Sequence, residues 1–324
     1  MSEAIPQRSA FVTGATGCIG SALTFQLAAE GWRVVALVRD VRRASFLNSL
    51  PNVELVEGEL ADADNLVTAM RDCRTVFHLA AKVHAAPGAT AEQFERDNVI
   101  GTRNIVAAAQ ENRVERFVYF STVAVYGDRD EPADETTLPA PTTDYGRSKL
   151  EAERIAMGSE LKTTVLRWPV VYGERDRGNV AKLIEAIRRN RYFIVGDGQN
   201  LKSVVAVENV VDAALLVASD EREIGQTFIV TDARAYSQLE IAMTIAELLG
   251  KRRPIKLPRW PMLMAGKAAD VMENMIGLKL PISSDQVRKL SSNTVFQAAK
   301  IERELGFIPR VALRDGLANE LKQH

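Results

Sequence analysis

The sequence predicts an α/β protein with a doubly wound parallel sheet and a smaller C-terminal α/β lobe that would bind substrate. Short apolar runs alternate with helix-like segments through the first half of the 324 residues, which is the pattern of βαβ units. A glycine-rich turn separates the first strand from the first helix, as in dinucleotide-binding folds. The chain is also long enough for two lobes.

The first half divides into strands and helices in alternation. Trp32–Val38 is an unbroken apolar run, which is typical of a strand that is buried on both faces of a parallel sheet. The expected strands are Ser9–Val12, Trp32–Val38, Val53–Glu57, Thr75–His78, Arg116–Ser121 and Thr163–Arg167. The expected helices are 19–30, 62–71, 91–112 and 144–157.

After Pro169 the alternation becomes irregular. We expect a dinucleotide-binding Rossmann domain over residues 1–170 and a substrate lobe over 171–324, with 203–232 as a candidate return to the sheet. The expected helices are 179–190, 208–219, 237–249, 260–275 and 284–291, and the expected strands are 193–195, 203–207 and 227–230. The proline-punctuated segments 251–261 and 279–283 are predicted to be loops.

Composition excludes several classes of protein. A net charge of -1 argues against a nucleic-acid partner. Two cysteines and three histidines are too few for a disulfide framework or a zinc site, so we expect no metal. The absence of a long apolar run or a signal pattern favours a soluble cytoplasmic protein without a membrane partner. Residues 251–324 nevertheless hold 14 Lys and Arg against 7 Asp and Glu, which indicates either attraction of an anionic substrate or solvated helix faces.

The turn Thr13–Gly20 (TGATGCIG) is the candidate cofactor loop. Its glycines allow a tight turn and close approach of the backbone to a pyrophosphate, and the helix that follows offers free N–H groups to the phosphates. The expected cofactor contacts of this loop are Gly14, Thr16, Gly17, Cys18, Ile19 and Gly20. We interpret Cys18 as a small packing residue rather than a redox thiol.

The end of the second strand bears on the choice of cofactor. Val38 stands where NAD-specific proteins place a carboxylate for the ribose, and Arg39 follows it. A guanidinium binds a 2′-phosphate well, so the sequence favours NADP(H). NAD(H) remains the alternative, in which Asp40 reaches the ribose.

A second cluster of candidate residues surrounds Tyr145. Tyr145 and Lys149 are four residues apart, which places them on one face of a helix, where an ammonium can lower the pKa of a phenol. Ser121 and Thr122 end a predicted strand, at the sheet edge where α/β proteins place their sites. The set predicts acid–base chemistry on a carbonyl or an alcohol.

Six segments in order resemble the extended short-chain dehydrogenases, the NAD-dependent epimerase/dehydratase family: TGATGCIG (13–20), FHLAAKVH (77–84), DNVIGTRN (97–104), FSTVAVYG (120–127), YGRSK (145–149) and LRWPVVYG (166–173). The resemblance implies Tyr145 as the acid/base, Lys149 as the modulator of its pKa and a ribose ligand, and Thr122 as a catalytic hydroxyl. It also implies that Asn98 orders the active-site helix and a water.

The same resemblance implies further cofactor contacts. Leu79, Ala80 and Ala81 would line the cofactor, and the stretch from Pro169 to Val171 would lie on the nicotinamide side. Gly58-Glu59-Leu60 corresponds to a segment that contacts adenine, with Glu59 in place of the family's Asp. The family also implies a homodimer, paired through the helices that carry Asn98 and Tyr145.

The substrate suggested by the resemblance is a nucleotide-sugar. Lys202 stands where such members carry a diphosphate-binding Arg, and Arg288 is a second candidate for that role. The other candidate substrate contacts are Ser121, Thr122, Lys82, His84 and Asn179.

Three functional hypotheses follow from the sequence. The first is 4-keto reduction or C4 epimerisation of a nucleotide-activated sugar. The second is a hydroxysteroid- or dihydroflavonol-type alcohol dehydrogenase, whose apolar pocket Trp260–Leu280 would line. The third, a cofactor-bound regulator without turnover, is disfavoured because Thr122, Tyr145 and Lys149 are all present.

Overall fold

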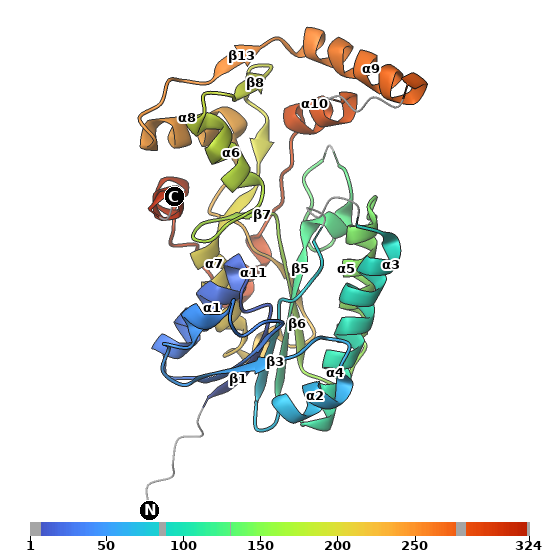
Figure 1. Ribbon diagram of the computed structural model, residues 1–324, viewed down its shortest axis with the longest axis vertical. Coiled ribbons are helices and arrows are strands. Elements are labelled where there is room, and N and C mark those ends of the chain that lie inside the picture. Colours follow the sequence, from blue (N-terminus) through green and yellow to red (C-terminus); the bar gives the residue numbers. More distant parts are fainter. Residues whose placement is uncertain (1–7, 84–88, 130, 277–282, 323–324) are drawn as a thin grey trace, which may run out of the picture.

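The computed structural model describes residues 8–83, 89–129, 131–276 and 283–322, apart from a few side chains between 271 and 289. Its centre is a sheet of seven strands: β1 (Ser9–Thr13), β2 (Arg33–Val38), β3 (Val53–Glu57), β4 (Thr75–His78), β5 (Arg116–Thr122), β6 (Thr163–Trp168) and β11 (Thr227–Ile229). They pair in the order β11-β6-β5-β4-β1-β2-β3, and every pairing is parallel (Figure 1). The prediction of a doubly wound parallel sheet is confirmed.

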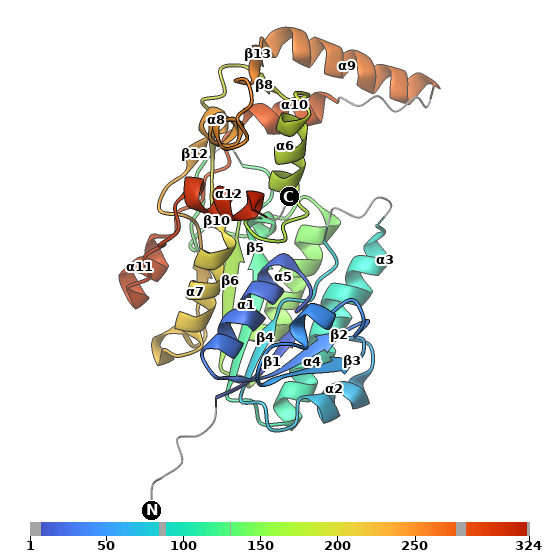
Figure 2. The same cartoon turned by 60° about the vertical axis from the view of Figure 1, so that its left-hand side comes forward.

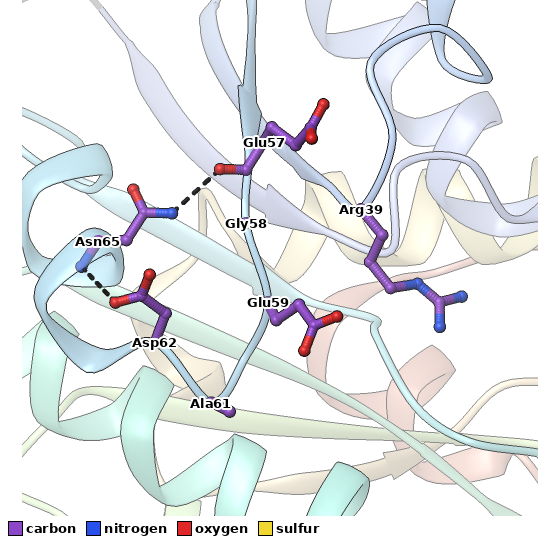
Figure 3. Close-up of a pocket in the computed structure, with 7 residues that line it drawn as sticks. All are labelled: Arg39, Glu57, Gly58, Glu59, Ala61, Asp62 and Asn65. Carbon is purple, nitrogen blue, oxygen red and sulfur yellow. Dashed lines mark hydrogen bonds between the residues drawn. The ribbon is translucent and has the colours of Figure 1, made fainter.

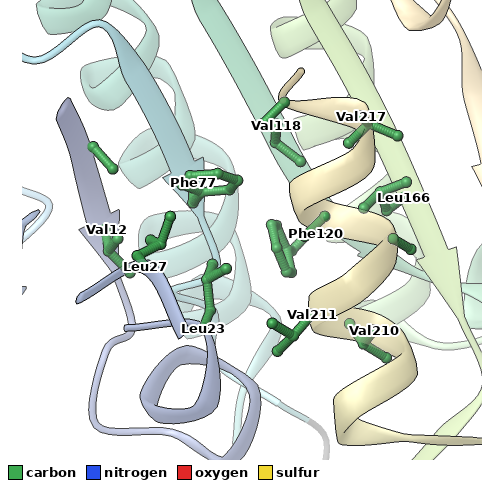
Figure 4. Close-up of a cluster of buried hydrophobic side chains, with 14 of the residues drawn as sticks. Val12, Leu23, Leu27, Phe77, Val118, Phe120, Leu166, Val210, Val211 and Val217 are labelled. Atoms are coloured by element: carbon green, nitrogen blue, oxygen red, sulfur yellow. The ribbon is translucent and has the colours of Figure 1, made fainter. Parts of the chain in front are cut away.

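Helices cover both faces of the sheet. Because strand residues alternate between faces, Phe117 and Tyr119 of β5 pack toward α2 (Ala63–Ala69), α4 (Gly101–Glu111) and α5 (Asp144–Met157). Val118 and Phe120 pack on the other face toward α1 (Cys18–Ala29) and α7 (Val207–Val217). Figure 4 shows this second core, with side chains of α1 and α7 meeting those of the sheet.

The strand order reverses between β1 and β4. The chain runs outward in one direction through β2 and β3 and in the other through β5 and β6. In open α/β sheets, ligands bind outside the carboxyl ends of the strands at such a reversal. The residues that follow β1 and β4 therefore frame the candidate site.

The helix expected over 91–112 is not continuous. It consists of α3 (Ala91–Phe94), a π-helical segment (Glu95–Ile100) and α4. One extra residue per turn changes the direction in which side chains point, and π-helical turns occur often at functional sites. This segment contains Asn98.

The remaining elements form a lobe beyond one end of the sheet (Figure 2). It contains three two-stranded pairs, made from β7 (Val170–Tyr172), β8 (Phe193–Val195), β9 (Leu201–Lys202), β10 (Val204–Ala206), β12 (Tyr236–Ser237) and β13 (Ile255–Leu257). Its helices are α6 (Asn179–Arg188), α8 (Gln238–Leu248), α9 (Arg259–Ile276), α10 (Ser284–Ser291) and α12 (Leu313–Leu321), and α11 (Ala299–Leu305) packs beside β11.

Two details of the lobe differ from the sequence-based expectation or extend it. The segment 251–261 is not a plain loop, because β13 within it pairs with β8. The chain also leaves the sheet after β6 and returns to it, since α7 packs against α1 and β11 pairs with β6. Among the described helices, none has both the length and the apolar character needed to cross a bilayer.

Candidate active site

The cofactor loop is built around two glycines that admit no side chain. Gly14 has a φ of 73°, and a Cβ on it would lie 2.8 Å from the backbone nitrogen of Ala80. A Cβ on Gly20 would lie 2.1 Å from the carbonyl oxygen of Gly14. Both distances are shorter than a Cβ atom makes to a non-bonded atom, so this turn needs glycine at both positions.

The first turn of α1 leaves its N–H groups open to an anion. Gly17 caps the helix without a side-chain hydrogen bond, and the first turn carries no acidic residue. Thr16 and Gly17 are exposed, while Cys18 and Ile19 are partly buried. Open N–H groups and the positive end of the helix dipole suit a pyrophosphate.

Cys18 is held by the lobe. Its thiol donates a hydrogen bond to the carbonyl oxygen of Glu174 at 3.2 Å. Burial, followed by the nearby carboxylates of Asp176 and Glu320, raises the pKa of the thiol, which therefore stays protonated at neutral pH. The residue joins the cofactor loop to the segment after β7.

A cavity of about 560 Å³ opens at the carboxyl ends of β2 and β3. It is lined by Arg39, Glu57, Gly58, Glu59, Ala61, Asp62 and Asn65. Figure 3 shows Asn65 bonded to Glu57 and Asp62 on one side, with Arg39 on the other. The cavity combines one guanidinium with three carboxylates beside the loop that follows β1.

A chain of hydrogen bonds links the end of β1 to the π-helical segment. Thr13 Oγ1 accepts from the backbone N–H groups of Leu79 and Ala80, so its own proton goes to His78 Nδ1 at 2.8 Å. His78 Nε2 then donates to Thr102 Oγ1 at 3.0 Å, and Thr102 donates to the carbonyl of Asn98 at 2.6 Å. The network thus assigns His78 one neutral tautomer.

Burial, and then the charge of Lys149, lower the pKa of His78 to about 3. The ring is therefore neutral at physiological pH, as the hydrogen-bond network requires. Both ring nitrogens of His78 have partners, so the side chain has a structural role in this network.

Asn98 is the centre of the next part of the network. Its side chain accepts from the backbone N–H of Lys82 at 2.7 Å and donates to the Lys82 carbonyl at 3.1 Å. It also donates to Ser148 Oγ at 2.9 Å, and Ser148 donates to the carbonyl of Tyr145. The side chain of Asn98 is 1% exposed, so it fixes the chain after β4 relative to the helix that carries Tyr145.

Tyr145 lies near the first turn of α5, beside Thr122 at the end of β5. Burial raises the pKa of Tyr145 to about 12, while a hydrogen bond with Thr122 acts in the opposite direction. Thr122 Oγ1 also accepts from the backbone N–H of Ala124. The phenol is therefore protonated in this structure at neutral pH.

Lys149 lies one turn further along α5 and is 2% exposed. Its ammonium donates to the carbonyl of Phe120 at 2.7 Å and lies 4.2 Å from the centre of the Tyr119 ring. Burial lowers the pKa of Lys149 to about 7, against the opposing charge of Glu153. Its expected effect on the pKa of Tyr145 stays a prediction.

Behind Lys149 lies a buried ion pair that the sequence analysis did not identify. Arg167 donates to both carboxylate oxygens of Glu153, at 2.9 and 2.5 Å, and to the hydroxyl of Tyr126 at 2.8 Å. Ser121 Oγ also donates to Glu153 and is 2% exposed. The hydroxyl of Ser121 thus bonds to Glu153 on the α5 face of the sheet, and its expected substrate contact stays a prediction.

The remaining candidate residues fall into two groups. Those expected at the cofactor lie at the carboxyl ends of the strands. Glu59 is exposed, and the others are partly buried: Leu60, Leu79, Ala80, Ala81, Pro169 and Val171. Those expected at the substrate lie on separate elements of the lobe: Asn179 begins α6, Lys202 is on β9 and Arg288 is on α10. His84 lies outside the described residues.

Lys202 is anchored within the lobe. It donates to Thr294 Oγ1 at 3.2 Å, and burial lowers its pKa to about 8. Lys82 contributes its backbone to Asn98, as described above. Asn179 and Arg288 are exposed.

Taken together, these residues fit a dinucleotide. The glycine cradle at Gly14 and Gly20 and the uncapped start of α1 suit the pyrophosphate, and the cavity at β2 and β3 suits an adenosine. Tyr145 and Lys149 follow β5, two strands away from β1 in the sheet. In the described part of the chain, no three His, Cys, Asp or Glu side chains are grouped to hold a metal ion.

Comparisons with known proteins identify the family of the chain. Residues 10–230 match the model of the "NAD dependent epimerase/dehydratase family". A 4-epimerase of Escherichia coli O157:H7 that acts on N-acetyl-α-D-glucosaminyl-diphospho-ditrans,octacis-undecaprenol is 28% identical over 316 residues, covering 95% of this chain and 93% of that protein. A 4-hydroxy-2-methyl-3-oxo-4-farnesyl-3,4-dihydroquinoline-1-oxide ketoreductase of Stigmatella aurantiaca is 31% identical over 319 residues, with 95% and 94% covered.

A solved structure extends the comparison to bound ligands. The structure of MoeE5 in complex with UDP-glucuronic acid and NAD is 30% identical in sequence and superposes with a TM-score of 0.76. The match covers 97% of this chain and 98% of that chain. With the family model matching more than half of the chain, the protein is an enzyme of the extended short-chain dehydrogenase type and belongs to the NAD-dependent epimerase/dehydratase family.

Proposed function

We propose that the protein catalyses oxidation and reduction at carbon 4 of a diphosphate-linked hexose, as a 4-epimerase or a 4-keto reductase. The observation that carries the proposal is the placement of Tyr145, at the start of α5, beside Thr122, at the carboxyl end of β5. Two hydroxyls at one point can hold a single substrate oxygen and exchange its proton. Related proteins that act on or bind diphosphate-linked sugars support this choice of substrate.

The residues have distinct roles in the proposed mechanism. A bound nicotinamide dinucleotide would supply the hydride acceptor and donor. Tyr145 Oη takes the proton from the hydroxyl on carbon 4 as that carbon is oxidised, and returns it when the ketone is reduced. Thr122 Oγ1 holds the same oxygen, so that it cannot rotate away from Tyr145.

Lys149 and Asn98 act around that proton transfer. The ammonium of Lys149, when protonated, favours the phenolate of Tyr145 electrostatically and offers a donor to the ribose. Asn98 holds the backbone of Lys82 against the helix of Tyr145 through Ser148. Lys202 and Arg288 are proposed to attract the diphosphate of the substrate.

The finer choice of cofactor depends on Arg39. Its guanidinium favours a 2′-phosphate, whereas Glu57, Glu59 and Asp62 in the same cavity oppose a second negative charge. The related structure with a bound cofactor holds NAD. The preference for NADP(H) therefore stays a prediction, as do the homodimer and the cytoplasmic location.

A second candidate is the reduction of a ketone on a molecule other than a sugar. The ketoreductase of Stigmatella aurantiaca, 31% identical over 95% of this chain, favours it. The same Tyr145 and Thr122 would serve either substrate. What differs is the lobe, where a sugar diphosphate needs Lys202 and Arg288 and an apolar ketone does not.

One experiment distinguishes the two candidates. The purified protein is incubated with UDP-glucose and with UDP-glucuronic acid, with and without added cofactor, and the configuration at carbon 4 is followed by proton NMR. Inversion at carbon 4 supports an epimerase. Failure to convert either sugar, together with cofactor-dependent turnover of a hydroxysteroid or a cyclic ketone, would overturn the sugar assignment in favour of the second candidate.

A further inference from the structure

Helix α9 exposes apolar side chains where a helix of a packed lobe would bury them. It rests on α10 through Gly266, where a Cβ would lie 2.7 Å from the backbone nitrogen of Ser284, and through the buried Ala269. Trp260 is 73% exposed and Met264 is 50% exposed, one helical turn apart. Figures 1 and 2 both show α9 at the outer end of the lobe, away from the sheet.

The chain that leads into α9, and α9 itself, carry exposed cations. The exposed basic residues between 251 and 270 are Lys251, Arg252, Arg253, Lys256, Arg259 and Lys267. Asp270 is the only acidic residue in that range, and its carboxylate accepts from the backbone N–H of Ser284 at 3.2 Å. Ile255, which is 70% exposed, adds apolar surface next to Lys256. The basic excess of residues 251–324 is thus concentrated beside exposed Trp, Met and Ile side chains.

We propose that the surface formed by residues 251–267 docks on the headgroups of an anionic lipid membrane. A helix that lies in the membrane interface places Trp and aliphatic side chains at the headgroup level and pairs Lys and Arg with anionic lipids. The lack of a membrane-spanning apolar run favours a protein without a membrane partner, but an interfacial helix needs no such run. The proposal is independent of the substrate.

Charge decides between a membrane and the other obvious occupant, a second copy of this chain. Two copies that met through α9 would bring their two sets of six exposed cations to one interface. That arrangement is repulsive, whereas a negative membrane surface attracts all six. The surface therefore fits anionic lipid better than it fits itself.

Intrinsic fluorescence can test the proposal directly. Of the three tryptophans, Trp32 and Trp168 are 4% and 9% exposed, so a change in polarity at the surface is reported by Trp260. The purified protein is mixed at low salt with vesicles of equal parts phosphatidylglycerol and phosphatidylcholine. We expect a blue shift of the emission and co-sedimentation with these vesicles. Binding to vesicles of phosphatidylcholine alone should be weaker by a factor of about ten or more.

Variants locate the binding to α9. Met264→Glu should abolish the blue shift, and Arg252→Ser with Arg253→Ser should weaken binding about tenfold or more. Two matched controls should bind like the unmodified protein: Ile308→Glu, which changes a 69% exposed apolar residue elsewhere, and Arg71→Ser with Arg103→Ser, which removes the same charge from the sheet domain.

Two results would overturn the proposal. One is a failure to bind the anionic vesicles, seen as neither a blue shift nor co-sedimentation. A loss of binding in the control variants as large as in Met264→Glu or in Arg252→Ser with Arg253→Ser counts as the same result. The other is self-association, seen by light scattering without vesicles and lost in Met264→Glu, which would assign the surface to a second copy of the chain.

Discussion

The side-chain amide of Asn98 donates a hydrogen bond to Ser148 Oγ across 2.9 Å, joining the π-helical segment to the helix that carries Tyr145. The same amide group makes two bonds to the backbone of Lys82. One buried side chain therefore holds together the segment after β4 and the start of α5. Its removal should be felt both in stability and in turnover.

We expect Asn98→Ala to lower the free energy of unfolding by about 1–3 kcal/mol, because the Lys82 backbone loses its partners in a buried setting. It should also lower turnover, since Tyr145 is no longer held through Ser148. Ser148→Ala, which breaks one of the three bonds, should have the smaller effect on both. Denaturant titration and steady-state kinetics measure the two effects, and an unchanged stability for Asn98→Ala would contradict the role given to it.

Tyr145→Phe tests the proposed acid/base. The substitution keeps the ring and its packing against Phe94 but removes the proton that is exchanged. Turnover should fall by about 10² or more, with little change in cofactor affinity. Tyr192→Phe, which removes the same atom from a tyrosine bonded to Gln238 in the lobe, is the control and should keep its activity. If Tyr145→Phe remained active on a substrate that the protein converts, the mechanism would be wrong.

Arg39→Ala tests the cofactor cavity. Loss of the guanidinium should weaken NADP(H) about tenfold or more and NAD(H) much less, because only the former carries a 2′-phosphate. Glu59→Gln should shift the ratio of the two affinities the other way, since it removes a carboxylate from the same cavity. Calorimetric titration of both cofactors gives that ratio. Equal changes for the two cofactors in Arg39→Ala would remove Arg39 from the ribose site.

Arg167 and Glu153 should contribute strongly to stability as a pair. Arg167→Met leaves Glu153, which is 4% exposed, without its bidentate partner. We expect a loss of about 3–5 kcal/mol, partly recovered when Glu153→Gln is added. Arg314→Met breaks an exposed pair with Glu247 and should cost far less. Urea unfolding of these three variants and of Glu153→Gln alone tests this, and additive losses in the double variant would argue against coupling.

His78 should make the protein sensitive to acid. The pKa of its buried ring is about 3, whereas an unfolded histidine titrates near 6.5. Between these values the unfolded chain binds a proton that the folded chain does not, so stability falls as the pH is lowered through this window. Between pH 7 and pH 5, the free energy of unfolding should therefore fall by about 2 kcal/mol less in His78→Asn than in the unmodified protein.

The control for this prediction is Thr102→Val. It removes a hydrogen-bond partner of His78 but keeps the imidazole. Its stability should be lower at pH 7 and should still fall on acidification. A His78→Asn variant with the full pH dependence of the unmodified protein would show that other groups cause it.

The parts of the site that are local in sequence could be predicted from it. The glycine loop and the four-residue spacing of Tyr145 and Lys149 each lie within a few residues, so one turn or one helix determines their geometry. The period of a strand also carried information that was not used. Because successive strand residues face opposite ways, alternation along β5 predicts that Ser121 and Thr122 point to different sides of the strand.

The rest depends on contacts between distant residues. Glu153 and Arg167 are on different elements, and only the pairing of β5 with β6 beneath α5 brings them together. The π-helical segment has no signal in the apolar pattern, which continues through it as it would through an α-helix. In the lobe, β13 (Ile255–Leu257) was not predicted because Pro254 and Pro258 flank it and prolines at this spacing indicate a loop.

The return of α7 and β11 to the sheet has a consequence for how the protein is made. As the chain leaves the ribosome, β6 emerges about 60 residues before β11. The segment between them contains β7, α6, β8, β9, β10 and α7. Until residue 229 has appeared, Val165 and Leu166 lie on an open strand edge and one face of β6 lacks its helix. Nascent chains that stop near residue 170 should therefore need a chaperone, and those that reach about residue 230 should protect β6 from proteases.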